Sequence, residues 1–261
     1  MSYKSGMDAN DENGRAEFSA QLRLAVAFLT RLPVAHAADD DDPLAVLDET
    51  PPDLASAMWL FPLVGFAIGG AGALALGALV WGGVPAPVAA TLAIGVMIWL
   101  TGALHEDGLS DIADGFGGGS DRDHKLEIMR DSRLGAYGTV TLAIVVVTKI
   151  AALATIAAHD VGAAAGALIA ATVWSRAPIA PTMRWLTPAR DDGLGANAGE
   201  PTEGDSWKGL GLAVLLVLLV LVTPAGFGVV TVLLAGGLAA FAVGMIALRQ
   251  IGGYTGGVLG A

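Results

Sequence analysis

Long apolar stretches alternate with short polar segments along most of the chain. The stretches are rich in Leu, Val, Ile, Ala and Gly, and most reach the roughly 20 helical residues that cross a bilayer core of about 30 Å. This pattern predicts an all-α fold, a polytopic membrane helix bundle of about six transmembrane helices. The predicted spans run roughly over residues 57–81, 86–104, 136–158, 161–181, 208–223 and 227–248.

The N-terminal region has a different pattern. Residues 1–15 are polar and of mixed charge, with no apolar region like that of a secretory signal peptide, and we expect a disordered tail there. Residues 16–261 are expected to form a single integral-membrane domain. An acidic linker is expected over residues 36–53, between prolines.

Between the tail and the linker, residues 16–31 show apolar positions at helical spacing. They predict an amphipathic helix that lies on the membrane surface or packs on the polar loops. The apolar positions are Phe18, Leu22, Val26 and Leu29.

The basic residues indicate an orientation. The connections at 82–85, 159–160 and 224–226 contain no Lys or Arg, whereas the other side collects all 14 basic residues except Lys149 and Arg176. The positive-inside rule makes that side cytoplasmic, with both termini and the active face on it, in a multi-pass protein of the cell membrane. Lys149 and Arg176 fall inside spans, where each should face the bundle interior or a wet cavity and pair with an acid or a carbonyl.

Composition supports this class. The chain is 54% hydrophobic and 15% charged, against about 25% charged in a typical soluble domain. The lipid bilayer is therefore its expected environment. A net charge of −11 argues against nucleic acid as a partner, and the absence of cysteine excludes disulfides and thiolate metal ligands.

An acidic segment, residues 105–115, follows the second predicted span. Asp107, Asp111 and Asp114 are spaced i, i+4 and i+7, which places them on one face of a helix. Like charges on one face repel, and a divalent cation is the simplest group that relieves the repulsion. Together with Glu106, these aspartates predict a Mg²⁺ site at the membrane surface.

The residues after this segment suggest phosphate binding. A glycine-rich turn over 115–120, with Gly117 and Gly118, lets a phosphate approach the backbone, although a plain turn has the same composition. Arg130 and Arg133 lie i, i+3 with Asp131 between them, and paired guanidinium groups bind phosphate oxygens. The alternative is that these arginines only mark the end of the third span.

Acids for Mg²⁺, arginines for phosphates and glycines for close approach together predict phosphoryl transfer at a membrane surface. A carboxylate that does not bind metal can accept the proton of an attacking hydroxyl. The candidate catalytic residues are Asp131, Arg130 and Arg133. The candidate substrate-binding residues are Arg122, Arg176, Arg184, Arg190, Gly117 and Gly118. For Arg176, snorkelling to the interface is the alternative.

The sequence resembles the cobalamin synthase family, adenosylcobinamide-GDP ribazoletransferase, over about residues 18–261. Four blocks carry the resemblance: residues 28–33, 105–135, 174–195 and 253–256. The second block is the most specific of the four.

The resemblance implies an Mg²⁺-dependent membrane enzyme of the last steps of cobalamin biosynthesis. Such an enzyme transfers the cobinamide-phosphate part of adenosylcobinamide-GDP to α-ribazole or its 5′-phosphate, giving adenosylcobalamin or its 5′-phosphate and GMP. An assembly with other cobalamin-pathway enzymes is a further expectation. The sequence departs from the family at Gly257, where the family typically has an acid, and the family pattern continues beyond Ala261 into a further helical segment. The resemblance therefore implies an incomplete cation clamp at Gly257.

Two other classes stay open from the residues alone. The first is another Mg²⁺-dependent membrane transferase, of the CDP-alcohol phosphotransferase or prenyltransferase type. The CDP-alcohol pattern includes a Gly-Ala-Arg element that is absent here, and the prenyl pattern usually has two aspartate-rich motifs, of which the second loop offers only Asp191 and Asp192. The second class is a cation transporter, which would place acids at mid-membrane rather than at one mouth of the bundle.

Overall fold

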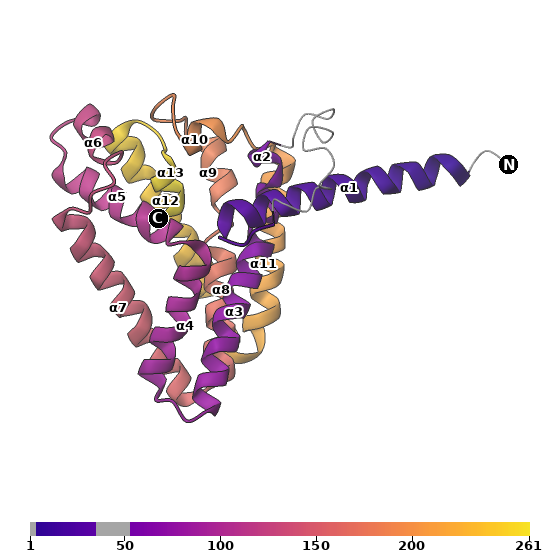
Figure 1. Ribbon diagram of the computed structural model, residues 1–261, viewed down its shortest axis with the longest axis vertical. Coiled ribbons are helices and arrows are strands. Elements are labelled where there is room, and N and C mark those ends of the chain that lie inside the picture. The colour runs from indigo at the N-terminus through magenta and orange to yellow at the C-terminus, as the bar shows by residue number, and fades with distance from the viewer. Residues whose placement is uncertain (1–3, 35–52) are drawn as a thin grey trace.

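The computed structural model describes residues 4–34 and 53–261, and within them the only strand-like feature is an isolated bridge between Pro188 and Tyr254. In these two ranges, five helical segments are long and apolar enough to cross a membrane, or six if a bent pair is counted as one span. The prediction of an all-α polytopic membrane bundle is confirmed (Figure 1).

The spans are built from nine of the described helices and one short 3-10 turn. The first combines α2 (Leu54–Ala57), η2 (Met58–Leu60) and α3 (Phe61–Trp81), and the bent pair is α4 (Ala86–Thr101) with α5 (Leu104–Gly118). Next come α7 (Ala136–His159) and the segment formed by α8 (Val161–Trp174) and α9 (Ile179–Trp185). The last are α11 (Glu203–Ala225) and α12 (Gly228–Ile251).

The remaining helices are short and polar or lie at the ends of the chain. They are α1 (Lys4–Leu29), α6 (Arg122–Ile128), α10 (Leu194–Asn197) and α13 (Gly256–Gly260). The end of the bundle that carries α5, α6, α10 and α13 is called the polar end below (Figure 1).

Small residues set the closest helix packing. A side chain at Gly65 or Gly69 of α3 would collide with Thr172 of α8, because an added Cβ would come within 2.4 Å of its carbonyl oxygen or 2.2 Å of its hydroxyl. Glycine at both positions therefore lets the two helices approach closely, as small residues do in membrane bundles.

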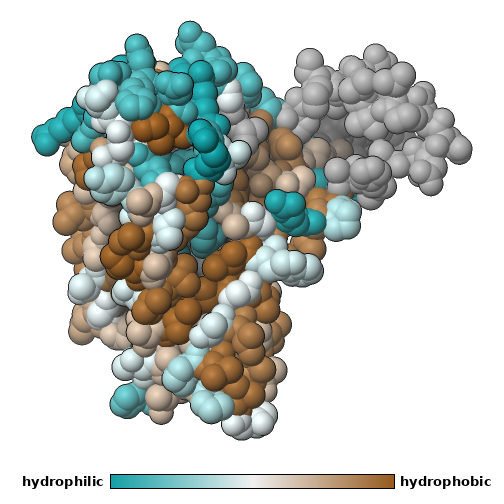
Figure 2. All heavy atoms as spheres, turned by 60° about the vertical axis from the view of Figure 1, so that its left-hand side comes forward, coloured by the Kyte–Doolittle hydropathy of each residue, from teal (hydrophilic) through white to brown (hydrophobic). Residues whose placement is uncertain are grey.

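The surface of the bundle matches a membrane environment. Figure 2 shows hydrophobic residues over the middle of the molecule and hydrophilic ones gathered at the polar end. Trp99 and Trp207, near the polar end, are exposed, as are Trp81 and Phe227 beside the opposite turns. Exposed aromatic residues at both ends are typical of the belts that lie at the two membrane–water interfaces.

The N-terminal helix α1 extends away from the bundle at the polar end, across the direction of the spans (Figure 1). Its C-terminal half packs on the bundle: Ala25 and Leu29 are fully buried, and Gln21 accepts a hydrogen bond from the Trp59 indole at 3.0 Å. The predicted helix over 16–31 is therefore confirmed, and it packs on η2 and α3.

The helix begins at Lys4, which corrects the expectation of a disordered tail over residues 4–15. Once the packed half of α1 has formed, each further helical residue adds one hydrogen bond, and Ala9 and Glu12 are good helix formers. Residues 1–3 of the expected tail, and the expected acidic linker up to residue 52, lie outside the described residues.

Candidate active site at the polar end

The position of α5 follows from the end of α4. Gly102 and Ala103 both have left-handed backbone conformations, with φ of 65° and 60°. The chain therefore turns by 88°, and α5 lies across the end of the bundle instead of continuing the second predicted span to residue 104. This turn keeps the acidic segment at the membrane surface, where carboxylates can stay hydrated.

A cavity of about 330 Å³ lies beside the first half of α5. Its other walls come from the end of α1, the α2–α3 segment, α9, the loop around α10, and α13. The chain thus brings together residues that are far apart in the sequence. The ionisable residues that line the cavity are His105, Asp107, Asp111 and Arg190.

Asp107 and Asp111 are the acids of this cavity. Among the described residues, neither carboxylate forms an ion pair, and neither accepts a hydrogen bond from a side chain. Burial, and secondarily the neighbouring Asp107, raises the pKa of Asp111 to about 6, against a smaller lowering by Arg190. Two uncompensated carboxylates facing one cavity suit a cation better than a packed core.

The described residues contain no group of three or more His, Asp or Glu side chains arranged to hold a metal ion. A Mg²⁺ ion nevertheless commonly uses only one or two carboxylates and takes its other ligands from substrate phosphates and water. Asp107 and Asp111 fit such a shared site, although they do not form a complete cage.

The other two predicted metal ligands lie elsewhere. Asp114 is buried, and its two carboxylate oxygens accept hydrogen bonds from the backbone N–H groups of Gly135 and Gly138, both at 2.8 Å. Asp114 thereby caps the start of α7. Glu106 faces Lys149 of α7, with 3.8 Å between the charged atoms. The predicted pairing of Lys149 with an acid is confirmed.

Arg190 is the predicted arginine that lines the cavity. Its Nε lies 3.5 Å from the carboxylate of Asp192, and its buried Nη1 has no hydrogen-bond partner among the described residues. Arg130 binds the same Asp192 with contacts of 2.7 and 2.8 Å. The two arginines therefore meet at one carboxylate on the rim of the cavity.

Three other predicted substrate-binding arginines are bound to the protein itself. Arg122 donates to the backbone carbonyls of Ile251 and Ala189, and Arg184 donates to the carbonyl of Pro201. Arg176 is buried and donates to the Thr172 carbonyl and the Ser175 hydroxyl. The predicted pairing of Arg176 with a carbonyl is confirmed, and its Nε has no partner among the described residues.

The predicted catalytic pair Asp131 and Arg133 lies on the surface, outside the residues that line the cavity. Hydrogen bonds from the Arg133 guanidinium and backbone hold the pKa of Asp131 below its usual range. The glycine-rich turn expected over 115–120 is helical up to Gly118. Gly117 packs against the ring of Tyr137, where an added Cβ would come within 2.7 Å, so this glycine serves close helix packing.

The structure adds one polar residue that the sequence-based candidates omit. His105 Nδ1 lies 2.9 Å from the Gly260 carbonyl oxygen, which fixes Nδ1 as the protonated nitrogen. Burial, and secondarily the nearby Arg176, lowers the pKa of His105 to about 4, so the ring is neutral. Its Nε2 is buried without a partner among the described residues. The position of His105 at the start of the acidic segment was the only sequence signal for it.

The C-terminal glycines complete the cavity. A side chain at Gly108 would come within 2.9 Å of the Gly257 carbonyl, so α5 and α13 lie in direct backbone contact. An added Cβ at Gly257 would lie 3.5 Å from the Asp111 Cβ, an ordinary contact distance. An acid at position 257 would therefore stand next to Asp111.

A helix bundle with an acid-lined cavity at its polar mouth defines a polytopic membrane protein with a site for a charged ligand. Residues 21–261 match the family model described as cobalamin-5-phosphate synthase, and the chain belongs to this family.

Two curated relatives carry the same name. A relative from Azorhizobium caulinodans is 43% identical over 245 residues, covering 93% of this chain and 90% of the relative. A relative from Bradyrhizobium diazoefficiens is 41% identical over 242 residues, covering 93% of this chain and 88% of the relative. Both are named adenosylcobinamide-GDP ribazoletransferase. No solved structure matches the chain.

Proposed function

We propose that this protein transfers the adenosylcobinamide-phosphate group of adenosylcobinamide-GDP to a hydroxyl of α-ribazole or its 5′-phosphate and releases GMP. The observation that carries the proposal is the cavity in which Asp107 and Asp111, beside Arg190, have no ion-pair partner among the described residues. The relatives named as ribazoletransferases supply the identity of the reaction.

The reaction needs one bond to form and one to break. The acceptor oxygen attacks the phosphorus that carries the cobinamide ester, and the bridging P–O bond of the diphosphate breaks, so that GMP leaves with the electron pair. Arg190, whose buried Nη1 has no acceptor within the described parts of the chain, binds a diphosphate oxygen and offsets its charge.

The hydroxyl proton needs an acceptor within the cavity. Asp111 suits this role, because a pKa of about 6 leaves it ionised at neutral pH yet more basic than an ordinary aspartate. Asp107 would hold Mg²⁺ together with phosphate oxygens of the substrate, and the bound ion would neutralise charge on the diphosphate. Asp131 is exposed outside the cavity, so its proposed contribution is to fix Arg133 at the surface.

The polar end is proposed to face the cytoplasm, since almost all Lys and Arg residues lie on that side and the substrates are charged and nucleotide-linked. The cell membrane is the proposed location, and an assembly with other enzymes of the pathway stays a prediction. A transporter function is not favoured, because Asp107 and Asp111 lie at the mouth of the bundle rather than at mid-membrane and Lys149 already pairs with Glu106.

The direct test uses the full chain, purified and reconstituted in lipid nanodiscs. Adenosylcobinamide-GDP, α-ribazole and Mg²⁺ are supplied together, and GMP and the corrinoid product are quantified by chromatography. We expect stoichiometric GMP and product that require both substrates, and loss of both when EDTA removes the cation. Absence of product with all components present would contradict the proposal, and cation flux into liposomes without nucleotide would favour a transporter instead.

A further inference from the structure

The cavity beside α5 has two unlike sides. The polar side carries the groups to which the proposed function assigns roles. The opposite side is formed by apolar residues from the end of α1, from the α2–α3 segment and from α9, and the reaction as described above gives it no role. Its members are Phe28, Leu29, Leu54, Met58, Phe61 and Ile179.

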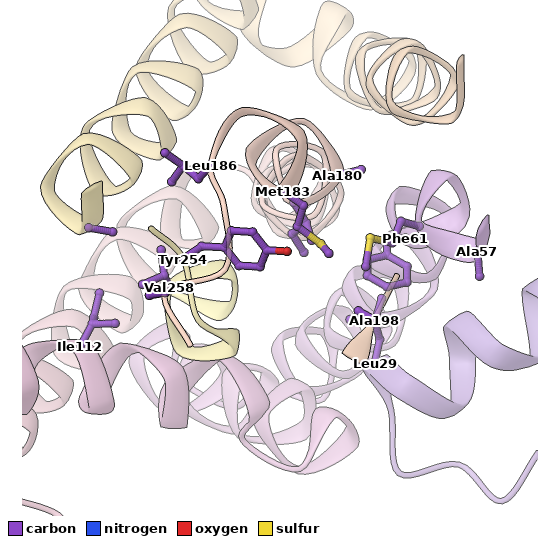
Figure 3. Close-up of a cluster of buried hydrophobic side chains, with 14 of the residues drawn as sticks. Leu29, Ala57, Phe61, Ile112, Ala180, Met183, Leu186, Ala198, Tyr254 and Val258 are labelled. Atoms are coloured by element: carbon purple, nitrogen blue, oxygen red, sulfur yellow. The ribbon is translucent and has the colours of Figure 1, made fainter. Parts of the chain in front are cut away.

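The apolar side is fixed by the core of the protein. Phe61 and Leu29 are fully buried and lie together with Ala198 in Figure 3. Phe28 stacks on Phe61 with ring centroids 5.7 Å apart and planes 12° from parallel, and it stays partly exposed. The end of α1 is anchored by a hydrogen bond of 2.8 Å from the Arg31 N–H to the Leu100 carbonyl. The cavity therefore has a preformed flat aromatic wall.

The volume of the cavity selects between the two substrates of the proposed reaction. At about 330 Å³ it lies near the lower end of the range of about 300 to 1,000 Å³ typical of small-molecule sites. A nucleoside with a bicyclic base fits a space of this size. The corrinoid ring of the donor is far larger, so the donor can reach this cavity only with its nucleotide part, whose guanine carries polar groups that the apolar side cannot bind.

We propose that Met58 and the ring of Phe28, which the buried Phe61 supports from behind, form the subsite for the flat, apolar base of the acceptor nucleoside and determine acceptor specificity. The proposal rests on the proposed function. With the base against this wall, the sugar hydroxyl points toward Asp111 on the polar side. The wall offers no side-chain hydrogen-bond group, so a base with exocyclic amino groups would leave them unpaired, whereas the dimethylbenzimidazole base of α-ribazole has no exocyclic polar group to lose.

The first test is steady-state kinetics with Phe28→Ala. Base–aromatic stacking predicts that the KM for α-ribazole rises about tenfold, while the KM for adenosylcobinamide-GDP and the kcat at saturating acceptor stay near wild type. Phe28→Tyr, which retains the ring, should keep most of the affinity. Phe18→Ala is the matched control, because Phe18 lies on the same helix and packs on Trp59 with ring centroids 6.0 Å apart, outside the cavity.

The second test measures specificity. The ratio of kcat/KM for α-ribazole to kcat/KM for the corresponding α-adenine nucleoside should fall severalfold in Met58→Gln, because the amide gives the polar base a hydrogen-bond partner. An unchanged specificity ratio in Met58→Gln would overturn the subsite. So would a raised KM for adenosylcobinamide-GDP, in place of α-ribazole, in Phe28→Ala.

A separate binding measurement distinguishes failure of the subsite from failure of the proposed reaction. Equilibrium dialysis of radiolabelled α-ribazole against the purified protein needs no turnover. Binding that weakens about tenfold in Phe28→Ala and not in Phe18→Ala supports the subsite even if no GMP is released. Absence of binding to the wild-type protein, or equal binding to Phe28→Ala with an unchanged melting temperature, would overturn it.

Discussion

The two halves of α5 carry the same type of residue in different surroundings. In the first half, Asp107 and Asp111 line the cavity and lack ion-pair partners among the described residues. In the second half, the carboxylate of Asp114 is buried and accepts hydrogen bonds from two backbone N–H groups at the start of α7. The difference teaches that spacing along a helix groups acids on one face, while the partners that the fold supplies decide which of them stay available for a ligand.

The largest expected effect is on catalysis in the first half. Asp111→Asn removes the proposed proton acceptor and one of the two carboxylate charges of the cavity, so we expect GMP release to fall by about 10² to 10⁴. The amount of folded protein in membranes should not change. Asp123→Asn is the matched control, since this exposed aspartate makes the same charge change away from the cavity. Near-normal turnover of Asp111→Asn would show that the acids in the first half of α5 do not act in the reaction.

The second half should respond in stability. Asp114→Ala leaves the N–H groups of Gly135 and Gly138 without their acceptor, and we expect a loss of about 2 to 4 kcal/mol of unfolding free energy. Denaturant titration in detergent micelles would measure it. Asp160→Ala, which removes an exposed cap at the opposite end of the bundle, should cost about 1 kcal/mol. If Asp114→Ala were as stable as Asp160→Ala but inactive, Asp114 would have a functional role like that of Asp107 and Asp111 and not a structural one.

A smaller effect is expected from adding an acid to the cavity. Gly257→Asp places a third carboxylate beside Asp111 without a steric conflict. The Mg²⁺ concentration for half-maximal activity should fall by about three- to tenfold. Gly257→Asn, which has the same size without the charge, should leave it unchanged. Equal Mg²⁺ dependence in both variants would show that position 257 does not contact the cation.

The smallest effect is a pH dependence of stability. The pKa of Asp111 is about 6 in the folded protein against an ordinary value of 3.8. The folded state therefore binds the proton more tightly than the unfolded state, and stability falls as the pH rises from about 4 to about 6. Asp111→Asn should be more stable than wild type by about 1 kcal/mol at pH 8, after allowance for a half-exposed group, and equal to it below pH 4. Thermal unfolding without Mg²⁺, at pH 8 and below pH 4, measures this difference in stability. The difference would be the same at both pH values if the pKa of Asp111 were not raised in the folded protein.

The sequence was sufficient for the features that depend on local pattern. The spans follow from apolar runs, and the pairing of Lys149 and Arg176 follows from the cost of an isolated charge among lipids. The segment after α4 was predictable only in part, because Gly102 favours a left-handed turn, whereas Ala103 gives no sign of one.

The sequence could not show which candidate residues line the cavity and which bind other parts of the protein, because this depends on contacts between distant segments. Nothing near Asp114 in the sequence shows that Gly135 and Gly138 will bind its carboxylate. Likewise, Arg122 and Arg184 resemble phosphate ligands in the sequence, and only the fold brings backbone carbonyls to them. The apolar wall was hidden among many other apolar residues, since Phe28 and Phe61 become a wall only when α1 and α3 meet α5.

The hydrogen bond between His105 and the Gly260 carbonyl joins residues 155 positions apart. All the spans after α5 must therefore be synthesised and inserted before the first polar helix receives its final neighbours. A nascent chain that lacks residues 252–261 would therefore hold the cavity without the wall that α13 supplies. Ribosome-stalled chains that lack residues 252–261 would report on this order of assembly.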